Sequence, residues 1–409
     1  MNIKHCRICL HTQLKPYLNL GFTPAADSFV TDAFLHQDDP SYPLEVCLCP
    51  NCGISQLSYT VPPEILYKYD YPYESSTTQT GRAHFFDLAG VVVEKFQLGS
   101  NDLVIDVGSN VGVLLDGFRT RGCRTIGIEP SGNIAEKALA RGIQTINDFI
   151  SPKLAAHIVQ DNGQASAVCI TNVFAHIHDL DGFMEAINIL LSDGGVLIIE
   201  APHFLKLIKN CEYDTIYHEH LLYISVRPLN HLFLRYGFMV SDVEEVSIHG
   251  GSVRIYVSRI GNNEPTDAVA KVIAAEERAG VFDFERLTGF SKDVMAHRKK
   301  LVKLLRTLKE EGRTLVGVSA PAKGMTLLNF CGIGVDLLDF ITEKSDMKIG
   351  RYTPGTHIPV LADSELISKN PDYALLLAWN FADEIIENLR EYRENGGKFI
   401  IPIPEPRIV

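Results

Sequence analysis

The 409-residue sequence has no long apolar run and little concentrated positive charge. No stretch approaches about 18 uninterrupted apolar residues, which argues against a transmembrane helix. Residues 1–6 have no apolar signal-peptide core behind their charges, so we expect a cytoplasmic protein. The formal net charge is −12 and the lysines and arginines are scattered. Nucleic acid is therefore not expected as the main partner, because phosphate binding needs a basic surface.

The sequence also lacks a secretion signal to accompany its nine cysteines, so they do not indicate a disulfide framework. Five of them fall within the first 52 residues: Cys6, Cys9, Cys47, Cys49 and Cys52. Cys6-x-x-Cys9 and Cys49-x-x-Cys52 are paired knuckles that place four thiolates around one ion, an arrangement that suits zinc. Cys47 is the alternative ligand. We predict one structural zinc per chain, because four thiolates leave no open position for catalysis.

Three regions of the chain differ in pattern. Residues 1–72 are rich in cysteine and proline and show little helical periodicity. Residues 73–262 alternate apolar runs with amphipathic stretches, as in βαβ units on a parallel sheet. Residues 263–409 begin with a charged helical linker and continue as a second, smaller α/β sheet. The sequence therefore predicts an α/β protein with a central Rossmann-like domain between a small N-terminal zinc-binding domain and a C-terminal Rossmann-like domain.

Individual strands are predicted from short apolar runs. Residues 103–107 and 124–128 are predicted as neighbouring buried strands of the central sheet. Residues 252–257 alternate in polarity and fit an antiparallel edge strand that closes this sheet. In the third region, residues 337–341 are predicted as a strand.

A glycine turn follows the first strand of the central region. The string Asp106-Val-Gly108-Ser-Asn110 precedes a helix, and such a turn lets the backbone approach a ligand at the helix N-terminus. Glu129 closes the next strand, where an acidic side chain can accept from both hydroxyls of a ribose. Because Asn110 replaces the second glycine of the dinucleotide pattern, NAD is the second choice. The string and Glu129-Pro130 resemble a class I S-adenosylmethionine site instead.

Further strings strengthen this interpretation, and they occur in the following order: Asn172–Asp179, Glu200–His203, Tyr217–His220, Ser319–Gly324 and Tyr352–Pro359. Together, behind a zinc segment, they resemble the three-domain S-adenosylmethionine-dependent sugar C-methyltransferases of deoxysugar biosynthesis. Members act on TDP-linked 4-keto-hexoses, usually at carbon-3. The match runs from about residue 6 to residue 404. The Tyr-His-Glu-His string is specific, whereas the glycine loop is shared with unrelated methyltransferases.

The resemblance implies roles for individual residues. The cofactor would be lined by Asp106, Gly108, Asn110, Glu129, Asp148, Phe149 and Asn172. The sugar would be surrounded by Tyr71, His176, Tyr217, Glu219 and His220. The nucleotide diphosphate would lie against Ser319, Lys323 and Gly324. The chain departs from the family at Val111, where a polar residue is usual, and at His178, where an acidic residue is common.

The expected reaction needs a base, because a carbon beside a ketone becomes nucleophilic only after it loses a proton. His220 has an ordinary pKa near about 6.5, which suits this task, and Glu219 is the competing base. Tyr217 and His176 are donors for the carbon-4 oxygen of the enolate. No catalytic metal is required. Three other histidines are interpreted as hydrogen-bonded core residues: His203, His231 and His249.

Two other functions remain open on the sequence alone. A zinc-ribbon RNA methyltransferase shares the cofactor fold and the zinc, but the acidic charge counts against it. A non-catalytic, zinc-stabilised binding protein is opposed by the intact Glu129 and the Tyr-His-Glu-His string. Lys323 is either a nucleotide ligand or an ordinary surface lysine. The sequence leaves open the sugar, the nucleotide (TDP, GDP or another), the carbon-3 substituent and the oligomeric state.

Overall fold

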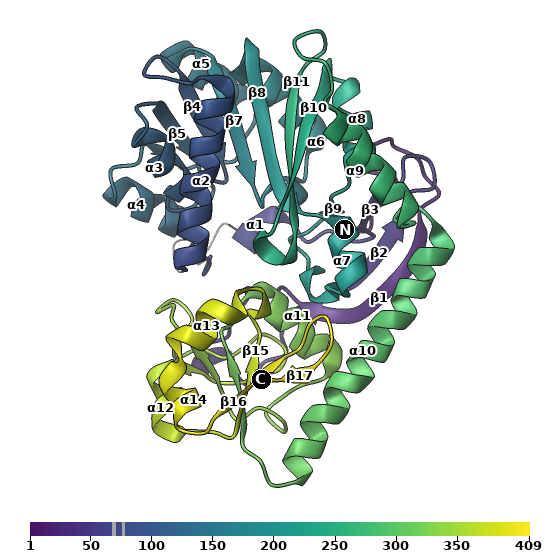
Figure 1. Cartoon of the computed structure of the whole chain (residues 1–409), viewed down its shortest axis with the longest axis vertical. Coiled ribbons are helices and arrows are strands. Elements are labelled where there is room, and N and C mark those ends of the chain that lie inside the picture. Colours follow the sequence, from purple (N-terminus) through teal and green to yellow (C-terminus); the bar gives the residue numbers. More distant parts are fainter. Residues whose placement is uncertain (68–70, 76–77) are drawn as a thin grey trace.

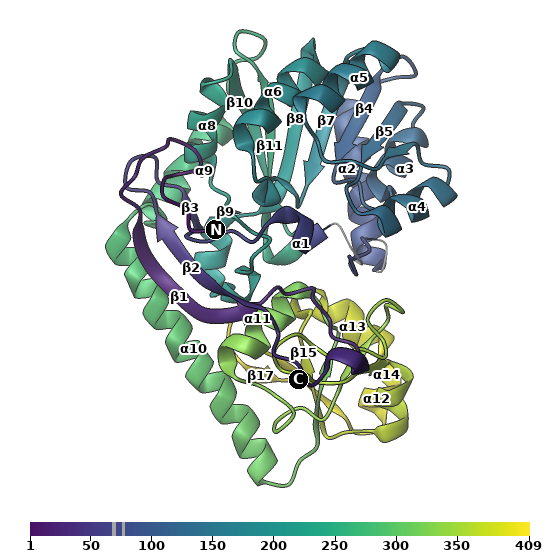
Figure 2. The same ribbon diagram turned by 180° about the vertical axis from the view of Figure 1, so that it is seen from behind.

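The computed structural model describes residues 1–67, 71–75 and 78–409 (Figure 1). The described chain forms three β-sheets. The central and C-terminal sheets belong to separate lobes, and the long strand β1 (Lys15–Pro24) runs alongside helix α10 (Phe284–Glu310), which joins the two lobes (Figures 1 and 2). Among these residues, no helix has the length and apolar character needed to cross a membrane.

The central sheet has the strand order β10-β11-β8-β7-β4-β5-β6. Its strands are β4 (Leu103–Val107), β5 (Arg124–Ile128), β6 (Thr145–Ile146), β7 (Ala165–Thr171), β8 (Leu191–Pro202), β10 (Phe238–Val246) and β11 (Ser252–Arg259). The strands from β4 to β8 pair in parallel, whereas β11 is antiparallel to both β8 and β10. This is the class I methyltransferase fold, and β4 and β5 have the predicted bounds.

The predicted edge strand at residues 252–257 is antiparallel, but it is not the edge. β10 lies outside β11, and all but the last residue of β11 are buried. The polar alternation comes from side chains that are buried with partners, because Arg254 donates from Nε to Glu200 at 2.9 Å. A buried ion pair therefore gave the same alternating sequence pattern as the exposed face of an edge strand.

Helices cover both faces of the central sheet (Figures 1 and 2). They are α2 (Gln79–Phe96), α3 (Val113–Arg119), α4 (Gly132–Ala140), α5 (Pro152–Asn162), α6 (Leu180–Leu190) and α8 (Val226–Leu234). Helix α7 (Phe204–Asn210) instead packs in a hydrophobic cluster with β1 and β2. Three short 3-10 helices lie on connecting segments: η2 (Phe174–His176), η3 (Tyr213–Thr215) and η4 (Ile248–Gly250). The predicted helical linker forms α9 (Asp267–Arg278) and α10.

The C-terminal sheet has the order β14-β13-β12-β15-β16-β17. Its strands are β12 (Leu315–Val318), β13 (Ile341–Glu343), β14 (Val360–Ala362), β15 (Tyr373–Leu376), β16 (Lys398–Ile401) and β17 (Arg407–Ile408). Its helices are α11 (Ala322–Cys331), α12 (Ser364–Lys369), η5 (Trp379–Phe381), α13 (Ala382–Asn388) and α14 (Arg390–Glu394). The second α/β domain that the sequence predicts is present.

The strand predicted at residues 337–341 is wrong by several residues, since β13 begins at Ile341. The amides of Leu337 and Leu338 both donate to the carbonyl of Gly334, which forms a turn. The two leucines are buried, so their apolar run reflects packing and not strand pairing.

The N-terminal sheet has the order β1-β2-β3-β9. Besides β1 it contains β2 (Ser41–Leu48), β3 (Ser55–Leu57) and β9 (Leu222–Tyr223), with the helices η1 (Asp32–Phe34) and α1 (Pro63–Tyr67) in the same region. The last strand comes from the central part of the chain and directly follows the Tyr217–His220 string. The N-terminal region is therefore joined to the central domain at the point where the sugar site is predicted.

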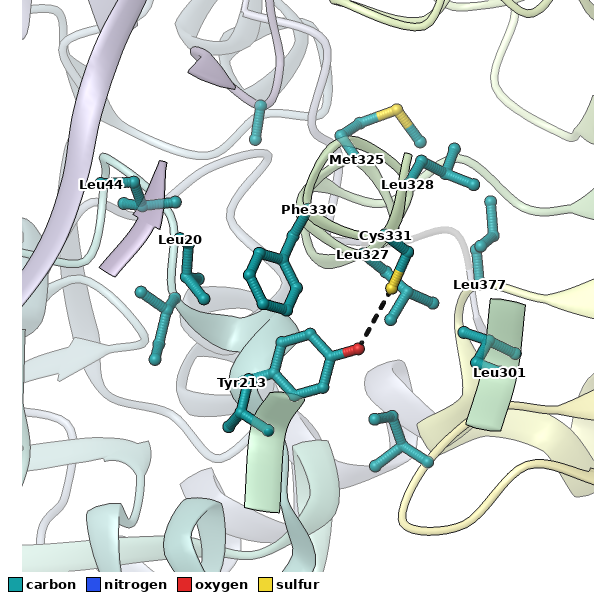
Figure 3. Packing of buried hydrophobic residues seen from close by; sticks show 14 of the residues in the cluster. Leu20, Leu44, Tyr213, Leu301, Met325, Leu327, Leu328, Phe330, Cys331 and Leu377 are labelled. Carbon is teal, nitrogen blue, oxygen red and sulfur yellow. Dashed lines mark hydrogen bonds between the residues drawn. The ribbon is translucent and has the colours of Figure 1, made fainter. Parts of the chain in front are cut away.

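One hydrophobic cluster contains residues of both lobes and fixes their relative position (Figure 3). The ring of Tyr213 in η3 packs against Phe330 of α11 with ring centroids 5.3 Å apart, and its hydroxyl lies 3.4 Å from the sulfur of Cys331. The same cluster takes in leucines from β1, β2 and α10: Leu20, Leu44 and Leu301. Because Lys323 opens α11 and residues 217–220 follow η3, this packing fixes the two predicted substrate loops relative to each other.

Candidate functional site

A cavity of about 620 Å³ is lined by residues from all three regions of the chain. It brings together fourteen predicted site residues: Tyr71, Asp106, Gly108, Asn110, Glu129, Asp148, Phe149, Asn172, His176, Tyr217, Glu219, His220, Ser319 and Lys323. Gly324 is not among the described lining residues. A Cβ at Gly324 would lie 2.8 Å from the Cβ of Leu377, so this glycine permits close packing of α11 on the sheet.

The glycine turn after β4 is tied to the end of β5. Gly108 and Asn110 adopt left-handed φ angles of 73° and 50°, and a Cβ at Gly108 would lie 2.5 Å from Val173. Glu129 accepts from the amides of Asn110 and Ser131, both at 2.9 Å. Burial raises the pKa of Glu129 despite these bonds. Its carboxylate therefore shapes the turn and also faces the cavity.

Two buried acceptors near this turn have no partner in the part of the chain that the structure describes. They are Oδ1 of Asp106 and Oδ1 of Asn172. Burial, and secondly the charge of Glu129, raise the pKa of Asp106 well above its usual range. An unpaired buried acceptor is costly, so this end of the cavity suits a cationic donor. The ammonium group of S-adenosylmethionine fits that requirement, and its sulfonium adds a second positive charge.

Tyr217, Glu219 and His220 of the Tyr-His-Glu-His string line the same cavity as the glycine turn. His220 donates from Nδ1 to the carbonyl oxygen of Thr215 at 2.7 Å, and its ring lies 4.0 Å from that of Tyr217 between centroids. His176 stands 5.1 Å from His220 and stacks on Tyr67. Burial lowers the pKa of His220 to about 4, and the nearby Lys323 charge acts in the same direction. The imidazole is neutral at physiological pH.

Glu219 is buried like its neighbour His220, but its pKa is shifted in the opposite direction. Its Oε2 atom is buried and has no partner among the described residues. Burial and the charge of Asp27 raise the pKa of Glu219 to about 8. A second cavity of about 130 Å³ reaches Asp27, Glu219 and Arg351. Asp27 lies 3.6 Å from Nζ of Lys348, which also donates to the carbonyl of Ala320 at 2.7 Å.

Lys323 faces the cavity from the C-terminal lobe. It is half-buried, and its Nζ atom lies 4.7 Å from the ring centroid of Trp379. Trp379 in turn donates to Asp214 at 2.6 Å. Burial lowers the pKa of Lys323, and the charges of Asp214 and Glu212 act in the opposite direction. The position differs from that of a freely solvated surface lysine.

The four predicted zinc ligands form one cluster. The sulfur atoms of Cys6, Cys9, Cys49 and Cys52 all lie within 4.8 Å of one another. The Cys6–Cys52 and Cys9–Cys49 sulfur pairs are 3.5 and 3.6 Å apart. These separations approach the edge of about 3.8 Å that a tetrahedral site with Zn–S bonds of about 2.3 Å requires. Cys47 lies outside the cluster, in β2, and the cluster does not line the large cavity.

Three families match successive parts of the chain. Residues 6–67 match the family described as a zinc binding domain, residues 87–243 a methyltransferase domain, and residues 247–404 the C-methyltransferase C-terminal domain. The C-methyltransferase NovU of Streptomyces niveus is 34% identical over 408 residues, which cover 100% of this chain and 97% of NovU. The chain belongs to the C-methyltransferases. This methyltransferase therefore uses S-adenosylmethionine as its methyl donor, and the cysteine cluster is its zinc site.

Two solved structures each match less than half of the enzyme. The magnesium protoporphyrin IX methyltransferase ChlM from Synechocystis PCC 6803, with bound SAH, is 14% identical, covers 46% of this chain and 90% of its own, and has a TM-score of 0.35. The PH0226 protein from Pyrococcus horikoshii OT3 is 12% identical, covers 46% and 94% of the two chains, and has a TM-score of 0.36. The fold of this enzyme is assigned from the strand order of its own central sheet.

The cavity also contains residues that the sequence did not single out. The new ones with ionisable or amide side chains include Asp27, His84, Glu343, Lys348 and Asn380. His249 lines the cavity as well, although it was interpreted as a core histidine, whereas His203 is buried and pairs with Glu276 at 2.9 Å. Glu343 lies at the carboxyl end of β13, as Glu129 lies just after the end of β5. A prediction with the correct bounds for β13 would have identified Glu343 as a candidate site residue.

Proposed function

We propose that this methyltransferase transfers a methyl group to carbon-3 of a nucleotide-linked 4-keto-deoxysugar, with TDP as the first nucleotide to test. The observation that carries the proposal is the hydrogen bond from His220 to Thr215, which leaves Nε2 of a neutral imidazole as an acceptor in the cavity. The membership of the C-methyltransferases supports carbon as the acceptor atom.

In the proposed reaction, Nε2 of His220 takes the proton from carbon-3, and the electron pair moves onto the carbon-4 oxygen as an enolate. Donors must then face this oxygen as its charge grows. Glu219 with a raised pKa is protonated at neutral pH and is one such donor, and Tyr217 is another. When the enolate collapses, carbon-3 forms its new bond to the methyl group. The methyl–sulfur bond of the donor would break in the same step, and its sulfur would leave as a neutral thioether.

S-adenosylmethionine, when bound, supplies the methyl group on a positively charged sulfur. Asp106 and Asn172 would hold its cationic end, and Glu129 would accept from its ribose hydroxyls. Asp148 and Phe149 would lie at its adenine, since both line the same cavity as Glu129. The role of these residues is to position the methyl donor against carbon-3, which supplies much of the rate.

The nucleotide diphosphate would lie at the C-terminal lobe. Ser319 has a φ of 65° in the turn between β12 and α11. The N-terminus of α11 would present backbone amides to an anion. Lys323 adds a positive charge from the first turn of that helix, at a half-buried position. Tyr71 and His176 would complete the sugar-binding wall. Residues 1–72, 73–262 and 263–409 would then bind zinc, cofactor and nucleotide, respectively.

The test is a product analysis. The enzyme is incubated with S-adenosylmethionine and a TDP-linked 4-keto-6-deoxyhexose, and the product is examined by proton and carbon NMR. We expect a new methyl group bonded to carbon-3 and no transfer to RNA in a parallel reaction. Methylation of an oxygen or of RNA, or no transfer to any nucleotide-linked keto sugar, would contradict the proposal.

A further inference from the structure

The carboxyl end of β13 carries a second carboxylate that ties a turn to a neighbouring strand. Glu343 accepts from the amide of Ala320 at 2.8 Å and from the amide of Ser345 at 3.1 Å. The amide of Ser319 donates to the carbonyl of Thr342, the residue before Glu343, at 2.8 Å. One carboxylate thus holds both the turn after β12 and the start of its own following segment.

The same pattern of bonds occurs in the predicted cofactor site. Glu129 accepts from Asn110 in the turn after β4 and from Ser131, two residues further along its own segment. The amide of Gly108 donates at 2.8 Å to the carbonyl of Ile128, the residue before Glu129. Glu129 directly follows β5 and Glu343 is the last residue of β13, and each of these strands lies beside the first strand of its sheet. In doubly wound sheets the strand order reverses at the first strand, and ligands bind there.

Glu343 also faces the large cavity in which the nucleotide sugar is proposed to bind. It lines the large cavity together with Lys344, Ser345 and Asn380. The Nδ2 atom of Asn380 is buried and has no acceptor in the described part of the chain. Lys323 lines the same cavity from the helix that follows the turn after β12. A hydroxyl acceptor, an unpaired amide donor and a cation therefore lie around one space.

We propose that Glu343 is the ribose-binding residue of a nucleoside diphosphate subsite, in which it accepts a hydrogen bond from the 3′-hydroxyl. This inference rests on the proposed function and adds the residue that recognises the nucleoside. The 3′-hydroxyl is common to deoxyribonucleotides and ribonucleotides, and in a ribonucleotide the 2′-hydroxyl would share the carboxylate. Lys323 would then face the diphosphate, and Nδ2 of Asn380 would donate to an acceptor on the nucleotide.

The test is a cycle between one side chain and one ligand hydroxyl. Binding of TDP and of 3′-deoxy-TDP is measured by calorimetry with the full-length enzyme and with Glu343→Gln. We expect the wild-type enzyme to bind 3′-deoxy-TDP about tenfold or more weakly than TDP, on the scale of a hydrogen bond to a charged group. Glu343→Gln should bind both ligands within about twofold of each other. The ratio of the two affinities is compared within each protein. A loosened turn in Glu343→Gln would weaken both ligands alike and would leave this ratio unchanged.

The control is Glu391→Gln, which changes an exposed carboxylate on α14 outside the cavity lining. It should keep the wild-type ratio. An undiminished preference for TDP in folded Glu343→Gln would overturn the role of Glu343 while leaving the proposed function intact. Failure of TDP, UDP and GDP to bind the wild-type enzyme would instead remove the nucleotide-sugar function itself. If UDP binds more tightly than TDP only when Glu343 is present, the 2′-hydroxyl also reaches this carboxylate, which supports the assignment.

Discussion

His220 donates a hydrogen bond from Nδ1 to the backbone carbonyl of Thr215 at 2.7 Å, and this bond selects the nitrogen that is left to react. A carbonyl only accepts, so Nδ1 carries the proton and Nε2 keeps its lone pair. Burial lowers the pKa of His220 to about 4 and raises that of Glu219 to about 8. In the proposed mechanism these adjacent residues take opposite roles, with His220 as the neutral base and Glu219 as the protonated acid.

The pH dependence of turnover follows from these two shifts. His220 is in its basic form above a pKa of about 4, and Glu219 is in its acidic form below a pKa of about 8. We predict that kcat stays nearly level from about pH 5.5 to pH 7 and falls as the pH passes about 8. A rise through about 6.5, as expected for an ordinary histidine, would contradict the assignment.

Asp27 provides a check on the alkaline limb, since its charge helps to raise the pKa of Glu219. Asp27→Asn should move the fall in kcat toward lower pH, because Glu219 then loses its proton more readily. Lys348→Met removes the cation beside Asp27 and should move the fall in the opposite direction. The phenols of Tyr67 and Tyr71 also face this group and stay neutral, because burial raises the pKa of both well above the ordinary value. Equal profiles in both variants would exclude Glu219 as the alkaline group.

Zinc removal should destabilise the enzyme, because metal binding supplies part of the folding free energy of its segment. Cys49→Ser should lose zinc and lower Tm by roughly 5–10 °C, as measured by metal analysis and calorimetry. Cys47→Ser is the matched control, since Cys47 is buried nearby but lies outside the cluster. It should keep one zinc per chain. Full zinc content in Cys49→Ser would show that the ligand set is different.

Cofactor affinity should depend on Glu129. Glu129→Ala should weaken binding of S-adenosylmethionine by about 1.5–3 kcal/mol, or roughly 10- to 150-fold, the scale for hydrogen bonds to a charged group. Part of this loss would arise from the turn, because Glu129 also holds the amide of Asn110. Asp116→Ala, on α3 and outside the cavity lining, should bind normally. If calorimetry gives both variants the same affinity, the ribose lies elsewhere.

Lys323 should act on the nucleotide sugar and not on the chemical step. Lys323→Met keeps the side-chain stem over Trp379 and removes the charge. We predict that KM for the nucleotide sugar rises about tenfold or more with a smaller change in kcat, since the bond to phosphate exists in both ground and transition states. Lys303→Met, at an exposed position of α10, is the control. A loss confined to kcat would place Lys323 in the chemistry instead.

Local features of the site are predictable from the sequence, and long-range ones are not. The turn after Asp106, the carboxylate of Glu129 and the paired cysteines depend on short spacings within single segments. By contrast, Asp27 reaches Glu219 only because the N-terminal sheet is completed by β9, a pairing between residues 55–56 and 222–223. Glu343 was missed because a buried turn resembled a strand and concealed the true end of β13.

The sequence also does not show which distant charges act on the pKa of a given residue. His220 and Glu219 are adjacent in sequence, and nothing in their spacing separates a base from an acid. The separation arises because burial lowers the pKa of His220 and raises that of Glu219, and the charge of Asp27 raises the pKa of Glu219 further. Such assignments need coordinates, because the charge of Asp27 comes from almost 200 residues away in sequence.

The most direct test of the central claim measures proton removal without methyl transfer. The enzyme is mixed with S-adenosylhomocysteine and a TDP-linked 4-keto-6-deoxyhexose in deuterated water, and loss of the carbon-3 proton signal is followed by NMR. We predict exchange in the wild-type enzyme, slower exchange in Glu219→Gln, and no exchange or methylation in His220→Ala, whose affinity for S-adenosylmethionine stays within about twofold of wild type. Wild-type exchange and turnover in folded His220→Ala would contradict the account and transfer the role of base to Glu219.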